Sequence, residues 1–326
     1  MLRFSVGTTG AFVLCEWMAW QPSALAAVLA AVLLSSLPSA PPLKVGIALV
    51  LVMALWAWLA FFLTTLLGEA LHILFGILAV GMFLAFFGLA RAKGQLPLTI
   101  LLVCFATIPV VTLALPAPYE DVFPKAFVRA MALAVVFTWI TFAIWPRPSP
   151  KPPDPPGAAL ESPIAAAVCG IVIVLPVMLI YLMYEITNAI PVLLTTVLLV
   201  AQMTEERGAA SARGKMIGNF LGGMIAVGAF YVLTVVPSLA TLALISFIIG
   251  FYFSRLIVGG GVRGGNALLA YNMTIVILGL ALLKGPQNSG TWGARLVQFA
   301  LASIFAVGMM KLLWPRLKRP RPIPTN

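Results

Sequence analysis

Two glutamates are the first candidates for chemistry, because each stands inside a long apolar run. Glu16 lies about fifteen residues into the first run, roughly 22 Å along a helix, and Glu185 occupies the matching place of a later run. A carboxylate at membrane depth is costly unless it is protonated, paired or exposed to an aqueous cavity, so these glutamates are candidates for proton coupling or substrate contact. The alternative is a place in the outer aromatic belt of the membrane. Their aromatic neighbours are Trp17, Trp20, Tyr181 and Tyr184.

Two cations start the third predicted helix of each half of the chain. Lys44 and Arg213 stand at its cytoplasmic end, and Asn219 follows Arg213 on the same helix. Such cations attract an anionic substrate toward an inward-facing vestibule, or they only reflect the general excess of Lys and Arg on the cytoplasmic side of membrane proteins. Both explanations remain open, and the three residues are candidates for substrate or proton coupling.

Three further polar residues interrupt a late apolar run. Asn266, Tyr271 and Asn272 fall within one predicted membrane helix. They either line a cavity or hydrogen-bond to a neighbouring helix, and they complete the set of candidates for substrate or proton coupling.

Small residues recur every four positions on one predicted helix. Gly214, Gly218 and Gly222, followed by Ala226, make a smooth face that lets another helix approach closely in lipid. The first half carries bulky residues at the equivalent places, so the contact is not symmetric. It lies within the chain or between the chains of a homodimer.

No residue cluster predicts a metal site, a cofactor or a catalytic centre. Cys15, Cys104 and Cys169 are scattered through apolar runs without a CxxC spacing, and the chain has one histidine. The loop 259–265 is rich in glycine but lacks the GK[ST] ending of a phosphate-binding loop. We therefore expect neither an enzyme nor a bound cofactor.

The composition of the chain predicts which kind of secondary structure positions these residues. The chain has 326 residues, of which 62% are hydrophobic and 9% are charged, and its mean hydropathy is +1.09. Water is not the main solvent of such a chain, and the predicted class is an all-α integral membrane protein in contact with a lipid bilayer. The net charge of +11 is spread singly between apolar runs, which argues against a nucleic-acid partner.

Apolar runs bounded by proline, glycine and charge predict twelve transmembrane helices. Residues 147–162 form a proline-rich cytoplasmic linker between a first unit, 1–146, and a second unit, 163–316, and 317–326 is a basic cytoplasmic tail. The predicted helices cover 3–20, 22–38, 43–67, 70–90, 96–115, 124–145, 163–187, 190–204, 213–235, 238–256, 264–283 and 292–314.

The two units are predicted to be a repeat of six helices each. Glu16 and Glu185 are separated by 169 positions, and the same offset relates several other markers. The other pairs are Pro22 with Pro191, Lys44 with Arg213, and Trp145-Pro146-Arg147 with Trp314-Pro315-Arg316. Because each unit crosses the membrane six times, both units have the same orientation, with a symmetry axis along the membrane normal.

The distribution of basic residues predicts that both termini are cytoplasmic. With this orientation, four of the twenty Lys and Arg residues fall on the outer side, and the other sixteen fall inside. The four outer cations are Lys125, Arg129, Lys284 and Arg295.

Short motifs in both units resemble a family of permeases. The opening Arg3-Phe4-Ser5-Val6-Gly7-Thr8, with Ala11-Phe12 and the stretch from Pro22 to Ser36, is similar to the start of fusaric-acid-resistance-like and aromatic-acid-exporter permeases. The second unit resembles them in Ile190-Pro191-Val192-Leu193-Leu194-Thr195-Thr196 and in the stretch from Arg213 to Gly223. The resemblance is to a short form of these permeases, without the cytosolic domain that larger relatives carry.

The resemblance implies a multi-pass efflux permease of the bacterial inner membrane. Its expected substrates are small anionic organic, including aromatic, acids or related toxic compounds. Export would be driven by the proton gradient, together with a periplasmic adaptor of the membrane-fusion type. The alternative hypothesis is a membrane scaffold that anchors an envelope or adaptor complex without moving solute.

Overall fold

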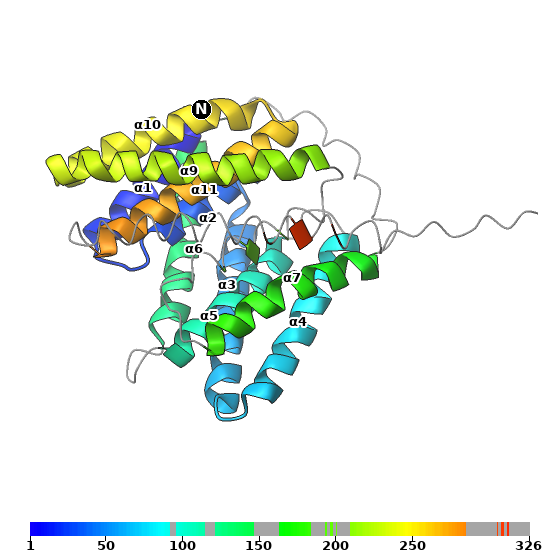
Figure 1. Ribbon diagram of the computed structural model, residues 1–326. Helices are drawn as coiled ribbons and strands as arrows, with labels where there is room; N and C mark the ends of the chain where they lie inside the picture. Colours follow the sequence, from blue (N-terminus) through cyan, green and yellow to red (C-terminus); the bar gives the residue numbers. More distant parts are fainter. Residues whose placement is uncertain are drawn as a thin grey trace, which may run out of the picture.

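The computed structural model contains ten helices in the residues that it describes (Figure 1). These residues are 1–91, 96–114, 121–146, 163–183 and 209–284, with the single positions 193, 196, 197, 200, 305, 308, 309 and 312. The helices are α1 (Leu2–Trp17), α2 (Ala24–Ser36), α3 (Leu43–Leu67), α4 (Leu71–Arg91), α5 (Leu96–Ala114), α6 (Val122–Ile144), α7 (Pro163–Met183), α9 (Ala209–Val235), α10 (Leu239–Val258) and α11 (Gly261–Lys284).

The chain is a multi-pass membrane protein, and the regular secondary structure of its described residues is entirely helical. Seven helices are long and apolar enough to cross a bilayer, namely α3, α4, α5, α6, α7, α10 and α11. Each described helix coincides with a predicted one, whereas the predicted helices 190–204 and 292–314 lie largely outside the described residues. The number of twelve therefore stays a prediction.

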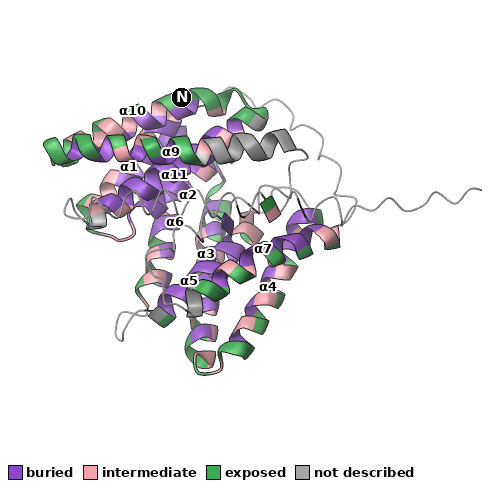
Figure 2. Cartoon of the chain, in the orientation of Figure 1, coloured by how far each residue is buried: buried purple, intermediate pink, exposed green. Residues whose placement is uncertain are grey.

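The outward faces of the helices are apolar, as a lipid environment requires. On α3, the residues that point inward recur every three or four positions and include Met53, Ala57 and Ala60, while Leu55 and Phe62 on the other face are exposed. Figure 2 shows the same division along α3 and α4. In water these faces would be unfavourable, so the hydrocarbon of the bilayer is their natural surrounding.

Two helices form the centre of the molecule. In α5 and α11, 72% of the residues in the most apolar 18-residue stretch are buried. In the other five spans, the buried share of the same kind of stretch is 28–44%. Helix α5 packs against α3, α4 and α7, and α11 packs against α9, α10 and α2. These two helices occupy equivalent places in the two predicted repeat units.

The helices form two groups, and each group takes members from both halves of the sequence. The α1 group consists of α1, α9, α10 and α11, and the α7 group consists of α7, α3, α4 and α5 (Figure 1). Helix α1 packs along α10, and α7 packs along α4, so each leading helix contacts the other half of the sequence. Helices α2 and α6 join the two groups, because α2 contacts α1, α6 and α11, and α6 contacts α1, α2 and α3.

Candidate functional site

The turn between α1 and α2 determines where the outer candidate residues lie. Helix α1 ends at Trp17, three residues before the predicted end, and Ala19 adopts a φ of +53°. The amide of Trp20 then donates to the Cys15 carbonyl at 2.9 Å. This tight reversal ahead of Pro22 places Trp20 beside the last turn of α1 rather than on the helix itself.

Glu16 is held by the start of the next helix. The Ser23 hydroxyl donates to its carboxylate, and Ser23 is the residue that precedes α2. Glu16 is half-buried. The carboxylate therefore lies at the N-terminal end of α2, where it accepts a hydrogen bond from a side chain of the next helix. Its predicted counterpart Glu185 lies outside the described residues.

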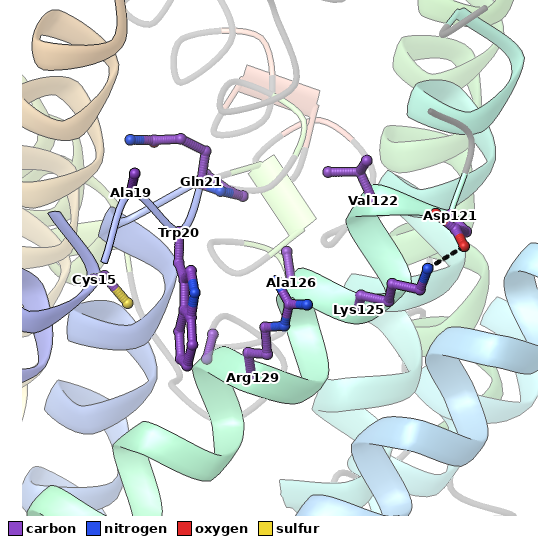
Figure 3. Close-up of a pocket in the computed structure, with 11 residues that line it drawn as sticks. Cys15, Ala19, Trp20, Gln21, Asp121, Val122, Lys125, Ala126 and Arg129 are labelled. Atoms are coloured by element: carbon purple, nitrogen blue, oxygen red, sulfur yellow. Dashed lines mark ion pairs between the residues drawn. The ribbon is translucent and has the colours of Figure 1, made fainter. Parts of the chain in front are cut away.

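A cavity of about 300 Å³ opens between this turn and the first two turns of α6 (Figure 3). The α1–α2 turn contributes Trp20 and Gln21 to its lining, and α6 contributes Lys125 and Arg129. The other lining residues are Cys15, Ala19, Pro22, Asp121, Val122, Ala126 and Ala130.

The cavity combines positive charge with an aromatic surface. Lys125 forms an ion pair with Asp121, one helical turn away. The Arg129 guanidinium lies 5.3 Å from the centre of the Trp20 ring and forms a cation–π contact. Among the described residues, no carboxylate forms an ion pair with Arg129. A planar guanidinium of this kind leaves its N–H groups available to a carboxylate ligand, while the tryptophan offers an apolar ring beside it.

The candidates at the cytoplasmic ends are not brought to this cavity. Lys44 is the second residue of α3 and is exposed. Arg213 and Asn219 lie in α9, where only their backbone is described. On the predicted topology, these cations lie at the opposite membrane surface from Glu16, Lys125 and Arg129.

The glycine face of α9 packs against α11 of the same chain. A Cβ atom on Gly218 would lie 3.0 Å from the carbonyl oxygen of Asn266, and one on Gly222 would collide with the carbonyl oxygen of Ala270. The Thr274 hydroxyl also donates to the Gly222 carbonyl at 2.9 Å. The glycines thus allow a backbone-to-backbone approach of two helices. Gly214 belongs to α9, but its side of the helix is not described.

Tyr271 and Asn272 are buried inside the α1 group. Tyr271 is fully buried, and its ring lies edge-on to Phe4 of α1 at 5.0 Å and to Phe253 of α10 at 6.0 Å. Asn272 is 3% exposed, and neither atom of its amide has a hydrogen-bond partner among the described residues. Asn266, one turn and a half earlier, is half-buried, and its side-chain oxygen also lacks a partner within the described part of the chain.

Three residues of these sites were not predicted to be functional. Arg129 was expected only as an outer cation, Trp20 only as a belt aromatic, and Ser23 had no assigned role. The positions of Trp20 and Arg129 relative to one another depend on the turn at Ala19 and on the packing of α2 against α6. No spacing in the sequence encodes that contact.

Comparison with known families reaches the part of the chain that contains the cavity. A family model described as "Protein of unknown function (DUF2955)" matches residues 1–141. The matched segment runs from α1 almost to the end of α6, and so it includes the α1–α2 turn and every residue that lines the cavity. It bears a different description from the permease families that the motifs resemble. No curated protein and no solved structure matches the chain.

Proposed function

We propose that the protein is an efflux permease of the bacterial inner membrane that exports small organic acids. The observation that carries this proposal is the cavity between the α1–α2 turn and α6, where Arg129 and Trp20 offer a cation and an aromatic ring together. With the N-terminus in the cytoplasm, this cavity faces the side to which an exporter releases its substrate. An organic anion would be bound there by the guanidinium and covered by the ring.

The proposed architecture is a pair of six-helix repeats that exchange their leading helices. Under the offset of 169 residues, the contact of α1 with α10 is the counterpart of the contact of α7 with α4. The contact of α3 with α5 is likewise the counterpart of the contact of α9 with α11. Two such groups, joined by α2 and α6, suit an alternating-access movement of one group against the other. Glu16 is the proposed proton-coupling residue, and a periplasmic adaptor and a homodimer remain proposed partners.

The direct test is uptake of radiolabelled benzoate by everted vesicles that contain the purified protein, with and without an imposed proton gradient. Gradient-dependent uptake is the expected result. Absence of uptake, also with adaptor present, would contradict export.

A matched pair of arginine variants tests the cavity itself. Arg129→Ala should raise the benzoate concentration for half-maximal counterflow from the outer side by at least about tenfold, because a charge-assisted hydrogen bond is lost. Arg91 provides the control, since it forms a similar contact with Phe87 at 4.8 Å at the predicted inner end of α4. Arg91→Ala should leave the outer half-saturation unchanged, and an equal effect of both variants would count against the cavity.

In a membrane scaffold, the glycine face of α9 and the basic cytoplasmic face would serve assembly, and the first of these two supports is lost. In this structure Gly218 and Gly222 are covered by α11. The basic cytoplasmic face alone does not distinguish a scaffold from a transporter.

A further inference from the structure

Buried polar atoms without partners are concentrated in one part of the molecule. Within the described residues, seven buried side-chain atoms lack a hydrogen bond, and six of them belong to α1, α10 and α11. An unsatisfied polar group in an apolar interior is costly, so a cluster of them requires an explanation. The polar set, as we call it, consists of Thr9, Ser246, Tyr271 and Asn272, with Thr8 beside Tyr271.

The members of the polar set lie near the middle of their helices. Thr8 and Thr9 are at the middle of α1, Ser246 is near the middle of α10, and Tyr271 and Asn272 are at the middle of α11. Helix α10 meets α1 at this level, because a Cβ atom on Gly250 would lie 3.5 Å from the Thr8 hydroxyl. Transport proteins commonly bind their solutes near the midplane of the bilayer, between helices of this kind.

The Tyr271 hydroxyl has no hydrogen-bond partner in the described chain. It lies close to the Thr8 side chain, but the geometry gives no hydrogen bond. The Thr8 hydroxyl instead donates to the carbonyl of Phe4 at 2.8 Å. Ser246 lies one helical turn from Gly250 on the same side of α10, and its hydroxyl also has no partner in the described chain.

Three members of the polar set have apolar counterparts in the other group of helices. Under the offset of 169 residues, the counterparts of Thr9, Tyr271 and Asn272 are Met178, Leu102 and Val103. All three counterparts are buried in the α7 group, where they fill the same kind of position with apolar side chains. A purely structural role at these three places is therefore served by apolar residues in the other group.

The charge around the set selects the kind of ligand. The charged residues of α1, α10 and α11 all lie in first or last turns, and α2, which packs on α11, has none. These end residues are Arg3, Glu16, Arg255, Arg263 and Lys284. The charged residues of α6, which packs on α1, and of α9, which packs on α11, are cations within the first eight residues of each helix. An ionised ligand would find no counter-charge here, whereas hydroxyl and amide groups can both donate to and accept from an uncharged one.

We propose that the polar set is a solute-binding site, seen here in its closed form, for small uncharged molecules that carry hydroxyl or amide groups on an apolar body. The rings of Phe4 and Phe253 form apolar walls on two sides of Tyr271. The site goes beyond the proposed export of organic anions, because it concerns a different ligand charge and a different place in the molecule.

Opening of the site requires that α11 move relative to α1 and α10. The connection between α10 and α11 contains Gly260 and Gly261, with φ values of +67° and +60°. Such backbone angles suit glycine and make this short connection a place where the two helices can change their angle.

The test uses the purified full chain, with benzamide as the uncharged probe and benzoate as its charged analogue. Binding is followed without any gradient, as the rise in melting temperature with probe concentration. Tyr271→Phe removes one hydroxyl and keeps the ring, and Asn272→Leu keeps the side-chain size. Each should weaken benzamide binding by about tenfold, which corresponds to one hydrogen bond. Benzoate at neutral pH should bind the polar set only weakly.

Thr112→Val is the matched control, because Thr112 in α5 is the one buried hydroxyl without a partner that lies outside the polar set in the described chain. This variant should bind benzamide like the wild type. If the wild type binds no benzamide, or if Tyr271→Phe and Asn272→Leu bind it as tightly as Thr112→Val, the proposal is wrong. Arg129→Ala should retain benzamide binding, so loss of anion export and loss of this site are separable.

Discussion

At the scale of single residues, the environment of Glu16 is more informative than its depth. The sequence left open whether this carboxylate faces the membrane or the outer interface. In the structure it lies in the last turn of α1, accepts a hydrogen bond from Ser23 and adjoins Cys15 of the cavity wall. The hydroxyl of Ser23 gives this half-buried carboxylate a hydrogen-bond partner at the start of α2, next to the cavity wall in the sequence.

Replacement of Glu16 and Glu185 together by Gln tests the proton-coupling role. The Gln oxygen at position 16 can still accept from Ser23, so the turn should keep its shape while the titratable group is lost. We expect gradient-driven benzoate uptake to fall to the level of empty vesicles, with normal amounts of protein in the membrane. Ser23→Ala is the companion variant, which removes the hydrogen bond but not the charge. Full uptake by the double Gln variant would exclude these residues as proton carriers.

At the scale of helices, α9 and α11 make the most extensive contact among the described elements. The glycines of α9 face the α11 backbone, and Thr274 bonds across the interface to Gly222. Helices in lipid gain little from apolar burial against one another, so their association depends on such close packing and on hydrogen bonds between them. The contact positions α11, and thereby Tyr271 and Asn272.

Gly222→Ala should destabilise this contact, because its new methyl group would meet the Ala270 carbonyl and the helices would have to separate. Overpacking of this kind costs about 1–3 kcal/mol, and we expect a clear fall in melting temperature, measured by fluorescence-detected size-exclusion chromatography after heating. Gly228 lies on the same helix with open space around it. Gly228→Ala should therefore melt at or above the wild-type temperature, and a similar fall in both variants would contradict the assigned contact.

At the scale of the whole molecule, the two halves of the sequence are interleaved. The first helix of the chain belongs with α9, α10 and α11, so a boundary drawn at residues 147–162 divides the sequence but not the packing. In the proposed movement of one group against the other, helices from both halves would move together. This arrangement also explains why the cavity lies between α6 and the α1–α2 turn, where the joining helices meet.

A disulfide between positions 5 and 250 tests the interleaving. A Cβ atom at Gly250 would lie 3.6 Å from that of Ser5, which is the separation that a disulfide needs. In a chain whose three native cysteines are replaced by Ala, Ser5→Cys with Gly250→Cys should crosslink on mild oxidation. A protease site placed within 147–162 then allows the two fragments to be followed on a non-reducing gel. Fragments that separate after cleavage would refute the contact of α1 with α10.

Composition and the spacing of apolar runs were sufficient to determine a helical membrane protein, because the bilayer permits few other structures and the length of a span is fixed by its thickness. The ranges of α3, α5 and α9 follow from runs bounded by Pro42, the charged stretch before Leu96 and Pro237. The glycine spacing in α9 likewise predicted a close helix contact, because such a contact depends only on the size of the residues that face the neighbouring helix.

Tertiary structure alone decided which residues meet. Trp20 faces Arg129 because of one turn at Ala19, and Tyr271 joins Thr8 and Phe253 because α1 packs on α10 of the other half. Apolar faces in lipid carry almost no information on their partners, since one helix covered with leucine, valine and alanine packs much like another. Contacts between distant segments are therefore set by the shape of the whole bundle, and the composition of the cavity and of the polar set follows from that shape.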